Sequence, residues 1–474
     1  MINVLKKTFQ TIFICFVLGF LITVNSQHLV TAAWSSHLRE NTAICTASGQ
    51  QSALQIIGDG DGGAIITLED ALNVHFDIYA QRVDAHGNIL WKKDGVSICS
   101  APENQNRPKI ISDGAGGAII TWHDIRGGIS NSDIYAQRID GDGSVQWTKD
   151  GIPICTEVNA QNSPCIATDG GGGAIIIWQD FRTNYADLYA QRINKNGELL
   201  WVKDGVLVCG TSGAQSAPVA VDDCVGGVIV TWQDFRRSYA DLYAQRVDGS
   251  GKILWERSGV ALCTAIGHES FPVITGNGAE GAIVAWVDTR NGNNDVFAQQ
   301  VDGNGTVQWL TNGIPVCTAS GNQNYPMITG DGAGGAILTW WDMRSGDFNI
   351  YAQRMDLTGN ALWVKDGLAV CIEAGIQNCS YISSDGSGGA IIAWNDNRIS
   401  AFDVYVQRID PKGLAKWSDK GVAVSIASDT QCFPVLVNDG TGGAIIVWQD
   451  SRDKDKSYWD VYAQKINGQG SLGD

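Results

Sequence analysis

The sequence is poor in positive charge, and no segment shows the apolar period of an amphipathic helix. Its 474 residues include 33 lysines and arginines against 50 aspartates and glutamates, which gives a formal net charge of −17. Nucleic acids and anionic membrane surfaces are bound through clustered lysine and arginine, so this charge balance disfavours both as partners. The 6 histidines are scattered and no Cys-x-x-Cys pair occurs, so no metal-site motif is present.

The chain also lacks an apolar run long enough to span a membrane. Two lysines precede an apolar run from Ile12 to Val24, which is shorter than the roughly 20 residues of a membrane helix. This pattern predicts a signal peptide over residues 1–26, with cleavage after Ser26 or near Ala32 and an uncleaved anchor as the alternative. We therefore expect a secreted protein, extracellular or periplasmic, with no further membrane insertion.

What the chain has in abundance is one repeated unit of about 54 residues. Each copy carries a Trp-x-Asp-x-Arg element, decayed in the first copy to Leu68, Asp70 and Leu72. The tryptophans of this element are Trp122, Trp178, Trp232, Trp286, Trp340, Trp394 and Trp448. A second tryptophan closes each copy, at Trp91, Trp147, Trp201, Trp255, Trp309, Trp363 and Trp417. Eight copies that cannot bury their apolar faces alone must stack on one another.

Each unit divides into four short segments bounded by turn residues, which we call strands a to d. In the second copy we expect strand a at 108–112, strand b at 117–122, strand c at 133–139 and strand d at 143–147. Asp-Gly-x-Gly-Gly and Asp-x-x-Gly sequences supply the tight a–b and c–d turns. The pattern predicts an all-β fold, an eight-bladed β-propeller of four-stranded antiparallel blades.

The two ends of the chain predict how the ring closes. The last copy stops at Asp474, where its closing tryptophan would fall, whereas Trp34 stands near the N-terminus without strands a to c of its own. We therefore expect the N-terminal segment to supply the outer strand of the last blade and so to remove an exposed sheet edge. Residues 27–474 are interpreted as a single propeller domain.

Most of the cysteines follow the repeat. Of 12 cysteines, those at the shared position are Cys45, Cys99, Cys155, Cys209, Cys263, Cys317 and Cys371, with Ser425 in the eighth copy. Equivalent positions in separate blades lie too far apart for disulfides, so we interpret these residues as small buried side chains. The irregular cysteines allow local pairs, of which Cys155–Cys165 and Cys371–Cys379 are the best spaced.

The repeated polar motifs are interpreted as structural. A Trp-x-Asp-x-Arg element in nearly every blade is suited to satisfying buried polar groups, because chemistry is seldom needed eight times. Gly-x-Gly-x-x-Gly at Gly58, Gly60 and Gly63, and again from Gly330, precedes a strand and predicts a hairpin instead of a phosphate site. No cofactor is expected. Calcium remains an alternative at Asp59 and Asp61 or at Asp140 and Asp142, although a distal carboxylate is missing.

Sequence variation concentrates in the b–c and d–a loops, which share one face of the predicted disc. Aromatic and basic side chains beside strand c make this face a candidate binding surface for a sugar or a protein. The candidate ligand-binding residues are Phe76, Tyr185, Tyr239, Arg237, Phe348, Phe402, Tyr458 and Trp459. The alternative is that these rings only cap the blade edges.

The c–d turns carry a resemblance to known propellers. The segments from Asp248 to Trp255 and from Asp356 to Trp363 resemble the tryptophan-docking motif of pyrroloquinoline-quinone-type eight-bladed propellers. They also look like the Asp-box turn of sialidase-type propellers. The resemblance covers the turns of all blades and implies propeller architecture. The Asp-to-Trp spacing fits neither family, and no adjacent cysteine pair or separate arginine triad is found, so neither family's catalytic residues carry over.

Three functional hypotheses are compatible with the sequence. The first is a secreted, non-enzymatic and monomeric propeller that binds a glycan or a protein at the cell surface through its b–c/d–a face. The second is an exported polysaccharide hydrolase or lyase with its site at the mouth of the central channel, and the third is a structural subunit of a cell-surface assembly. The first is favoured because blades 3 and 4 are nearly identical, and because the break at Leu68-Glu69-Asp70 in blade 1 removes polar groups. We therefore expect no enzymatic activity.

Overall fold

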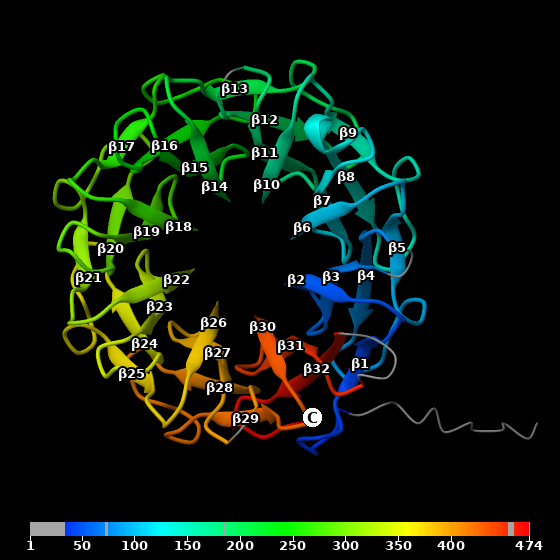
Figure 1. Cartoon of the computed structure of the whole chain (residues 1–474), viewed down its shortest axis with the longest axis vertical. Coiled ribbons are helices and arrows are strands. Elements are labelled where there is room, and N and C mark those ends of the chain that lie inside the picture. The colour runs from blue at the N-terminus through cyan, green and yellow to red at the C-terminus, as the bar shows by residue number, and fades with distance from the viewer. Residues whose placement is uncertain (1–33, 72–73, 184, 400, 454–458, 474) are drawn as a thin grey trace, which may run out of the picture. The chain divides into compact units, whose positions relative to one another are not determined.

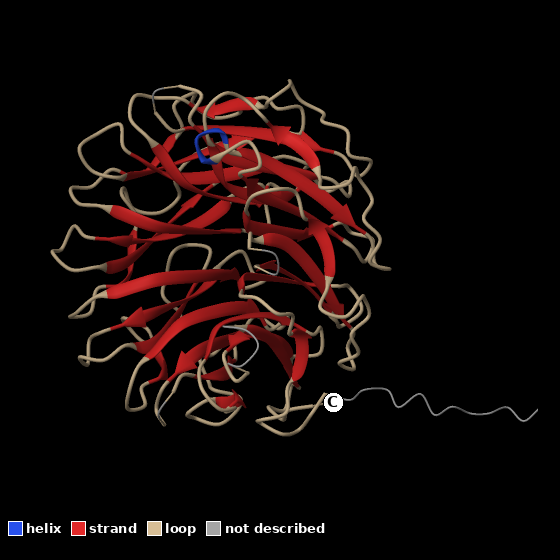
Figure 2. Cartoon of the chain, turned by 45° about the vertical axis from the view of Figure 1, so that its right-hand side comes forward, coloured by secondary structure: helices blue, strands red, loops and turns tan. Residues whose placement is uncertain are grey.

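The computed structural model describes residues 34–71, 74–183, 185–399, 401–453 and 459–473. Eight four-stranded antiparallel sheets stand around a central opening as the blades of a propeller (Figure 1). Figure 2 shows strands and loops almost throughout, and the described residues contain one short 3-10 helix, η1 (Ile129–Asn131). Within these residues no helix has the length and apolar character needed to cross a membrane. The predicted all-β, eight-bladed propeller is confirmed.

Each blade takes its four strands in chain order from the central opening outwards. Blades 1 to 4 comprise β2 (Gln51–Gly58), β3 (Ala64–Asp70), β4 (Asp77–Val83) and β5 (Val96–Cys99); β6 (Gln105–Ser112), β7 (Ala118–Asp124), β8 (Asp133–Ile139) and β9 (Ile152–Cys155); β10 (Gln161–Thr168), β11 (Ala174–Asp180), β12 (Asp187–Ile193) and β13 (Val206–Cys209); and β14 (Gln215–Asp222), β15 (Val228–Asp234), β16 (Asp241–Val247) and β17 (Val260–Cys263).

Blades 5 to 8 repeat the same order, and the last blade takes its outer strand from the N-terminal end of the described chain. They comprise β18 (Glu269–Gly276), β19 (Ala282–Asp288), β20 (Asp295–Val301) and β21 (Ile314–Cys317); β22 (Gln323–Gly330), β23 (Ala336–Asp342), β24 (Asn349–Met355) and β25 (Leu368–Cys371); β26 (Gln377–Ser384), β27 (Ala390–Asp396), β28 (Asp403–Ile409) and β29 (Val422–Ser425); and β30 (Gln431–Asn438), β31 (Ala444–Asp450), β32 (Asp460–Ile466) and β1 (Thr42–Cys45).

The a–b turns form as their sequence predicts. In blade 2 the Asp113 carboxylate accepts hydrogen bonds from the backbone N–H groups of Ala115 and Gly117, each at 2.8 Å. A Cβ atom on Gly117 would lie 2.3 Å from a backbone oxygen, so this position requires glycine. The strand that follows is buried on both faces. The Gly58 and Gly330 motifs lie in hairpins of the same kind, which confirms their interpretation as turns.

The position predicted for strand d was wrong. Residues 143–147 form a turn that touches strand c through one isolated bridge, and the fourth strand of blade 2 is β9, farther along the chain. The closing tryptophan leaves the sheet because its indole N–H donates to a backbone oxygen of the next blade, as from Trp91 to Gly141 at 3.0 Å. Gly151, at φ 91°, then turns the chain beneath Trp122, where a Cβ would lie 2.5 Å from the indole.

The predicted closure of the ring is confirmed. Strand β1 pairs antiparallel with β32 and completes the last blade. Trp34 precedes β1, is buried, and donates its indole N–H to the backbone oxygen of Ala85 at 2.9 Å. This is the same contact that the closing tryptophans make between the other blades. Trp34 is therefore the eighth docking tryptophan, placed on the turn of blade 1. The predicted signal peptide, residues 1–26, lies outside the described residues.

The Trp-x-Asp-x-Arg element joins neighbouring blades, which confirms its structural interpretation. In blade 2, Asp124 accepts hydrogen bonds from Trp122 at 2.8 Å and from Arg126 at 2.6 Å. The same guanidinium lies 3.3 Å from the sulfur of Cys99 in blade 1 and 3.9 Å above the ring of Tyr135. The repeated cysteines are thus buried contact residues. All cysteines in the described residues are free, so the predicted pairs Cys155–Cys165 and Cys371–Cys379 were wrong.

Candidate active site at the mouth of the channel

The innermost strand of every blade carries a bulge near the d–a loop, at the third residue of the strand. This residue has a left-handed backbone, with φ between 49° in Ala217 and 56° in Arg107, although none of the eight is glycine. The eight residues are Ala53, Arg107, Ser163, Ala217, Phe271, Tyr325, Cys379 and Phe433. Such a conformation costs about 1–2 kcal/mol for a residue with a Cβ atom. Unlike the tryptophans and aspartates of the repeat, this position differs in chemistry from blade to blade.

A second variable position lies beside the bulge, at the middle residue of the Trp-x-Asp element. Its eight occupants are Glu69, His123, Gln179, Gln233, Val287, Trp341, Asn395 and Gln449. Several of these side chains reach the next blade: the Asn395 side-chain oxygen accepts from the backbone N–H of Phe433 at 3.0 Å, and Gln233 donates to the backbone oxygen of Glu269 at 2.8 Å. The two variable positions therefore lie together at this mouth of the channel, where they form a ring of residues that differ between blades.

Blades 1 and 2 bring an acid, a base and a cation together in this ring. The Glu69 carboxylate is 8% exposed and accepts hydrogen bonds from the backbone N–H of Arg107 at 2.5 Å and from the Ser52 hydroxyl at 3.1 Å. The Arg107 guanidinium donates to the Ser163 hydroxyl at 3.3 Å. Glu69 thus holds the backbone of Arg107 at its bulge, while the guanidinium reaches the inner strand of blade 3.

His123 completes this group as a neutral imidazole. Burial, as the larger cause, and the positive charge of Arg107 together lower the pKa of His123 to about 4, against the opposing effect of Asp124. Its Nε2 atom is buried and has no hydrogen-bond partner among the described residues. A neutral imidazole with a free nitrogen can act as a proton acceptor.

Arg107 and Lys109 make this side of the channel a cationic pocket. Both line a cavity of about 290 Å³ together with Ser163 and residues of the neighbouring inner strands. Burial lowers the pKa of Lys109. The arginines of the repeated Asp–Arg pairs are neutralised by aspartates, but within the described chain neither Arg107 nor Lys109 has an ion-pair partner. Two unpaired cations in an acidic protein suit an anionic ligand.

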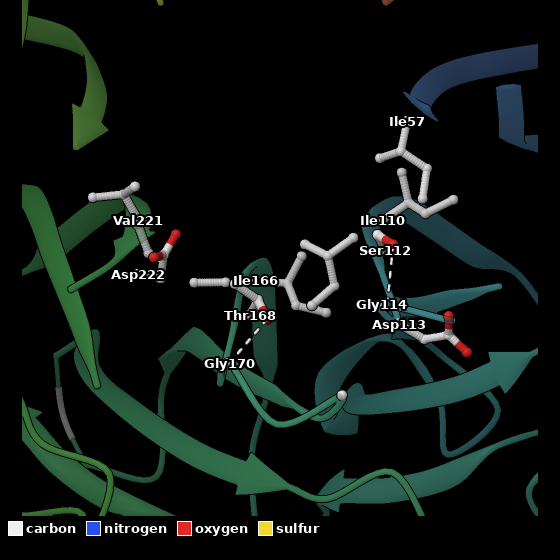
Figure 3. Close-up of a pocket in the computed structure, with 14 residues that line it drawn as sticks. Ile57, Ile110, Ser112, Asp113, Gly114, Ile166, Thr168, Gly170, Val221 and Asp222 are labelled. Atoms are coloured by element: carbon white, nitrogen blue, oxygen red, sulfur yellow. Dashed lines mark hydrogen bonds between the residues drawn. The ribbon is translucent and has the colours of Figure 1, made fainter. Parts of the chain in front are cut away.

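A larger cavity lies elsewhere on the channel wall, near the a–b turns. It measures about 440 Å³ and is lined mainly by aliphatic side chains such as Ile57, Ile110, Ile166 and Val221 (Figure 3). Its one buried acid, Asp113, is already engaged by Arg138 at 2.8 Å. No lysine, arginine or histidine lines this cavity, so we place the candidate chemistry at the opposite mouth.

The sequence-predicted binding residues are spread around the rim instead of meeting at one site. Tyr185 and Tyr239 are 57% and 45% exposed, and the guanidinium of Arg237 is paired with Asp241 at 2.7 Å. Four of the set accept a hydrogen bond through their backbone oxygen from the first strand of the next blade, namely Phe76, Phe348, Phe402 and Trp459. Phe348 also contacts Trp341. Tyr458 lies outside the described residues, and a ligand role for the set remains a prediction.

Two candidate metal sites are already filled by protein cations. Asp59, the calcium alternative, accepts hydrogen bonds from Arg82 at 2.9 Å and from backbone N–H groups of its own turn. Cys263, Glu269 and Asp288 also approach one another, but Arg290 lies 3.0 Å from the sulfur and 2.5 Å from Asp288. Arginine supplies the positive charge in both places, so neither cluster is assigned a metal.

Known proteins resemble this chain in fold but not in sequence. No family model and no curated protein sequence matches the chain. Among solved structures, a polysaccharide lyase of a new family, an ulvan lyase, aligns at 10% identity and TM-score 0.50 over 93% of this chain and 97% of its own. A second structure of this type, bound to -[GlcA(1-4)Rha3S]-, aligns equally well. An α-L-arabinanase of Penicillium chrysogenum aligns at 11% identity and TM-score 0.38 over 65% of this chain and 94% of its own.

These findings correct two expectations. The hypothesis of a non-enzymatic binding propeller, and with it the expectation of no enzymatic activity, is contradicted, because the propeller that aligns with 93% of this chain at TM-score 0.50 is a polysaccharide lyase. At this identity the likeness itself shows the fold alone. The structure also corrects the argument from blade 1, where the sequence break does not only remove polar groups. Glu69 is a gained carboxylate, and it meets Arg107 of the next blade.

Proposed function

We propose that the protein is an exported lyase that cleaves a uronate-containing polysaccharide at the b–c/d–a mouth of its channel. The observation that carries this proposal is the meeting of Glu69, Arg107 and His123 in blades 1 and 2, where the repeat is broken in adjacent copies. The predicted signal segment supports export. The ulvan lyase with a similar fold supports the class of substrate.

The residues divide the chemistry of β-elimination between them. Arg107 and Lys109 bind the uronate carboxylate and neutralise it, which acidifies the neighbouring C–H bond. His123 removes that proton. The electron pair of the C–H bond forms a carbon–carbon double bond as the glycosidic C–O bond breaks, and the leaving oxygen takes up the proton that His123 received. Glu69 is a positioning residue, because it holds the backbone of Arg107.

The composition of the ring favours elimination over hydrolysis. Glycoside hydrolysis by the common mechanisms uses two carboxylates on either side of the scissile bond. Glu69 is the one acid at the bulge position and at the middle position of Trp-x-Asp in all eight blades. Elimination requires a base and a cation, and both are present.

The test is to incubate the purified protein with ulvan and follow the ultraviolet absorbance of the new conjugated double bond. His123→Ala should lower kcat about 10²–10⁴-fold, the usual loss for a general base. Activity should also fall as pH decreases through about 4, where His123 becomes protonated. Arg107→Ala should raise KM for the charged substrate and also lower kcat, because it removes the charge that acidifies the C–H bond.

Gln233→Ala, at the position of His123 in blade 4, is the matched control and should retain activity. New reducing ends without the absorbance would identify a hydrolase instead of a lyase. Equal activity of His123→Ala and the wild type would refute the assignment of the base.

A further inference from the structure

Blades 5 and 6 break the repeat in a different way from blades 1 and 2, by introducing aromatic rings. The Phe271 and Tyr325 rings, at neighbouring bulges, lie 4.7 Å apart between centroids. Tyr325 lies 4.3 Å from Trp341, and Trp341 lies 6.1 Å from Phe348 of the b–c loop. These four side chains, which we call the aromatic row, run from the channel mouth out across blade 6.

The fold does not require these rings. The equivalent bulge residues in blades 1 and 4 are Ala53 and Ala217, and those blades adopt the same bulge. Trp341 is one of two tryptophans among the 17 that occupy no repeat position, the other being Trp459.

The row is also exposed to solvent at its inner end. Phe271 and Tyr325 are 47% and 44% exposed, so they leave apolar ring surface in water while adopting a strained backbone. Exposed and adjoining aromatic rings on a rigid scaffold are typical of a binding surface.

The row lies across the channel mouth from the cationic pocket. In Figure 1, β18 and β22 line the opening on the side opposite to β6, which carries Arg107 and Lys109. The row itself contains no charged group, and its flat apolar faces match the C–H faces of pyranose rings. A polysaccharide that places a carboxylate at Arg107 can therefore extend over the mouth towards blades 5 and 6.

We propose that the aromatic row is an accessory subsite that stacks sugar rings of the same polysaccharide chain at a distance from the bond being cleaved. This inference rests on the proposed function for the identity of the chain, but the row is assigned a binding role of its own. It lowers KM for long chains and leaves the chemical step at His123 unchanged.

The experiment measures binding and cleavage separately. Tyr325→Ala is made in the wild type and in the His123→Ala background, and binding is measured by the retardation of the protein in gels that contain ulvan or, as a neutral comparator, arabinan. We expect about tenfold weaker binding to ulvan, together with a similar rise in KM for the polymer, while kcat and the KM for a short oligosaccharide stay unchanged. Tyr325→Phe should behave as the wild type, because it preserves the ring.

Phe235→Ala, an exposed aromatic (40%) on a blade 4 loop outside the row, is the control for general loss of surface aromatics. If ulvan retards the wild type but not Tyr325→Ala, and the wild type does not cleave ulvan, the binding role of the row is supported and the proposed lyase activity is contradicted. Cleavage of ulvan with equal KM and retardation in wild type and Tyr325→Ala would overturn the row alone. Equal loss in Phe235→Ala, or a fall in kcat with unchanged KM, would also overturn it.

Discussion

At the scale of single residues, small departures from a repeated pattern change the local chemistry completely. In seven blades the first residue of the inner strand is a buried glutamine, whose amide donates to carbonyls of the preceding loop, as Gln51 does to Gly49 at 2.9 Å. Blade 5 has Glu269 at this place. It is fully buried, and both carboxylate oxygens lack a hydrogen-bond partner among the described residues. Burial raises the pKa of Glu269 to about 8, and the nearby Asp288 contributes.

Glu269 is therefore expected to make stability depend on pH. Its folded pKa of about 8 exceeds the ordinary value of 4.5, so the stability present below pH 4.5 is lost as pH rises through 8. Glu269→Gln restores the amide donor and should stabilise the protein by on the order of 2 kcal/mol above pH 8, with little effect at pH 4. Denaturant unfolding of both proteins across this range provides the measurement, and a constant difference at all pH values would contradict the idea.

At the scale of the strand, the bulge explains why side chains of the inner edge reach the channel. A regular inner strand would alternate its side chains between the two neighbouring blades. The left-handed residue interrupts this alternation, and its side chain is exposed in Phe271, Tyr325 and Phe433. All eight blades carry this strained backbone, including blades 1 and 4, where the bulge residue is only an alanine. The bulge is thus a property of the blade, and the substituent it carries is what specialises each copy.

Relief of this strain should stabilise the fold. Ala217→Gly removes the Cβ atom at φ 49° and should raise stability by about 0.5–1 kcal/mol, since the relief exceeds the entropy cost of glycine. Ala220→Gly, on the same strand at an ordinary conformation, should destabilise by about 0.5–1 kcal/mol. Thermal unfolding of the two variants gives the comparison, and destabilisation by both would show that the bulge is not strained.

At the scale of the whole propeller, residues from the two ends of the described chain share the last blade. Besides the β1–β32 pairing, the backbone oxygen of Ser35 accepts a hydrogen bond from Gln464 at 2.8 Å, and Asn41 accepts one from Arg452 at 2.7 Å. Trp34 then joins this blade to blade 1 as Trp91 joins blade 1 to blade 2. The junction between the chain ends is built from the same contacts as the others.

The closing tryptophan should therefore contribute as much as an internal one. Trp34→Ala should lower stability by about 3–5 kcal/mol, because it removes a buried indole, and Trp91→Ala should do the same. Trp34→Phe, which retains a ring but loses the N–H donor, should cost less than Trp34→Ala. Unfolding midpoints of the three variants test this, and a negligible effect of Trp34→Ala beside a large effect of Trp91→Ala would show that the closure is weak.

The architecture could be predicted from the sequence, because each feature of a blade is local. The hairpin turns, the buried second strand and the tryptophan spacing lie within one copy, and the missing strand at Asp474 together with the spare Trp34 predicted the closure. The prediction placed the fourth strand wrongly, because the closing tryptophan donates its hydrogen bond to the next blade and not to its own sheet. Comparison of the eight copies position by position would also have singled out Glu69, His123 and Trp341.

Which of these departures from the repeat lie in contact could be seen only in the folded propeller. Glu69 and Arg107 belong to different copies. Their contact depends on the bulge, which the sequence does not reveal because none of the eight left-handed residues is glycine. The same is true of Phe271, Tyr325 and Trp341, whose rings come together because neighbouring blades place equivalent bulges side by side. A repeat fixes what each copy builds, whereas the packing of one copy against the next decides which side chains share a site.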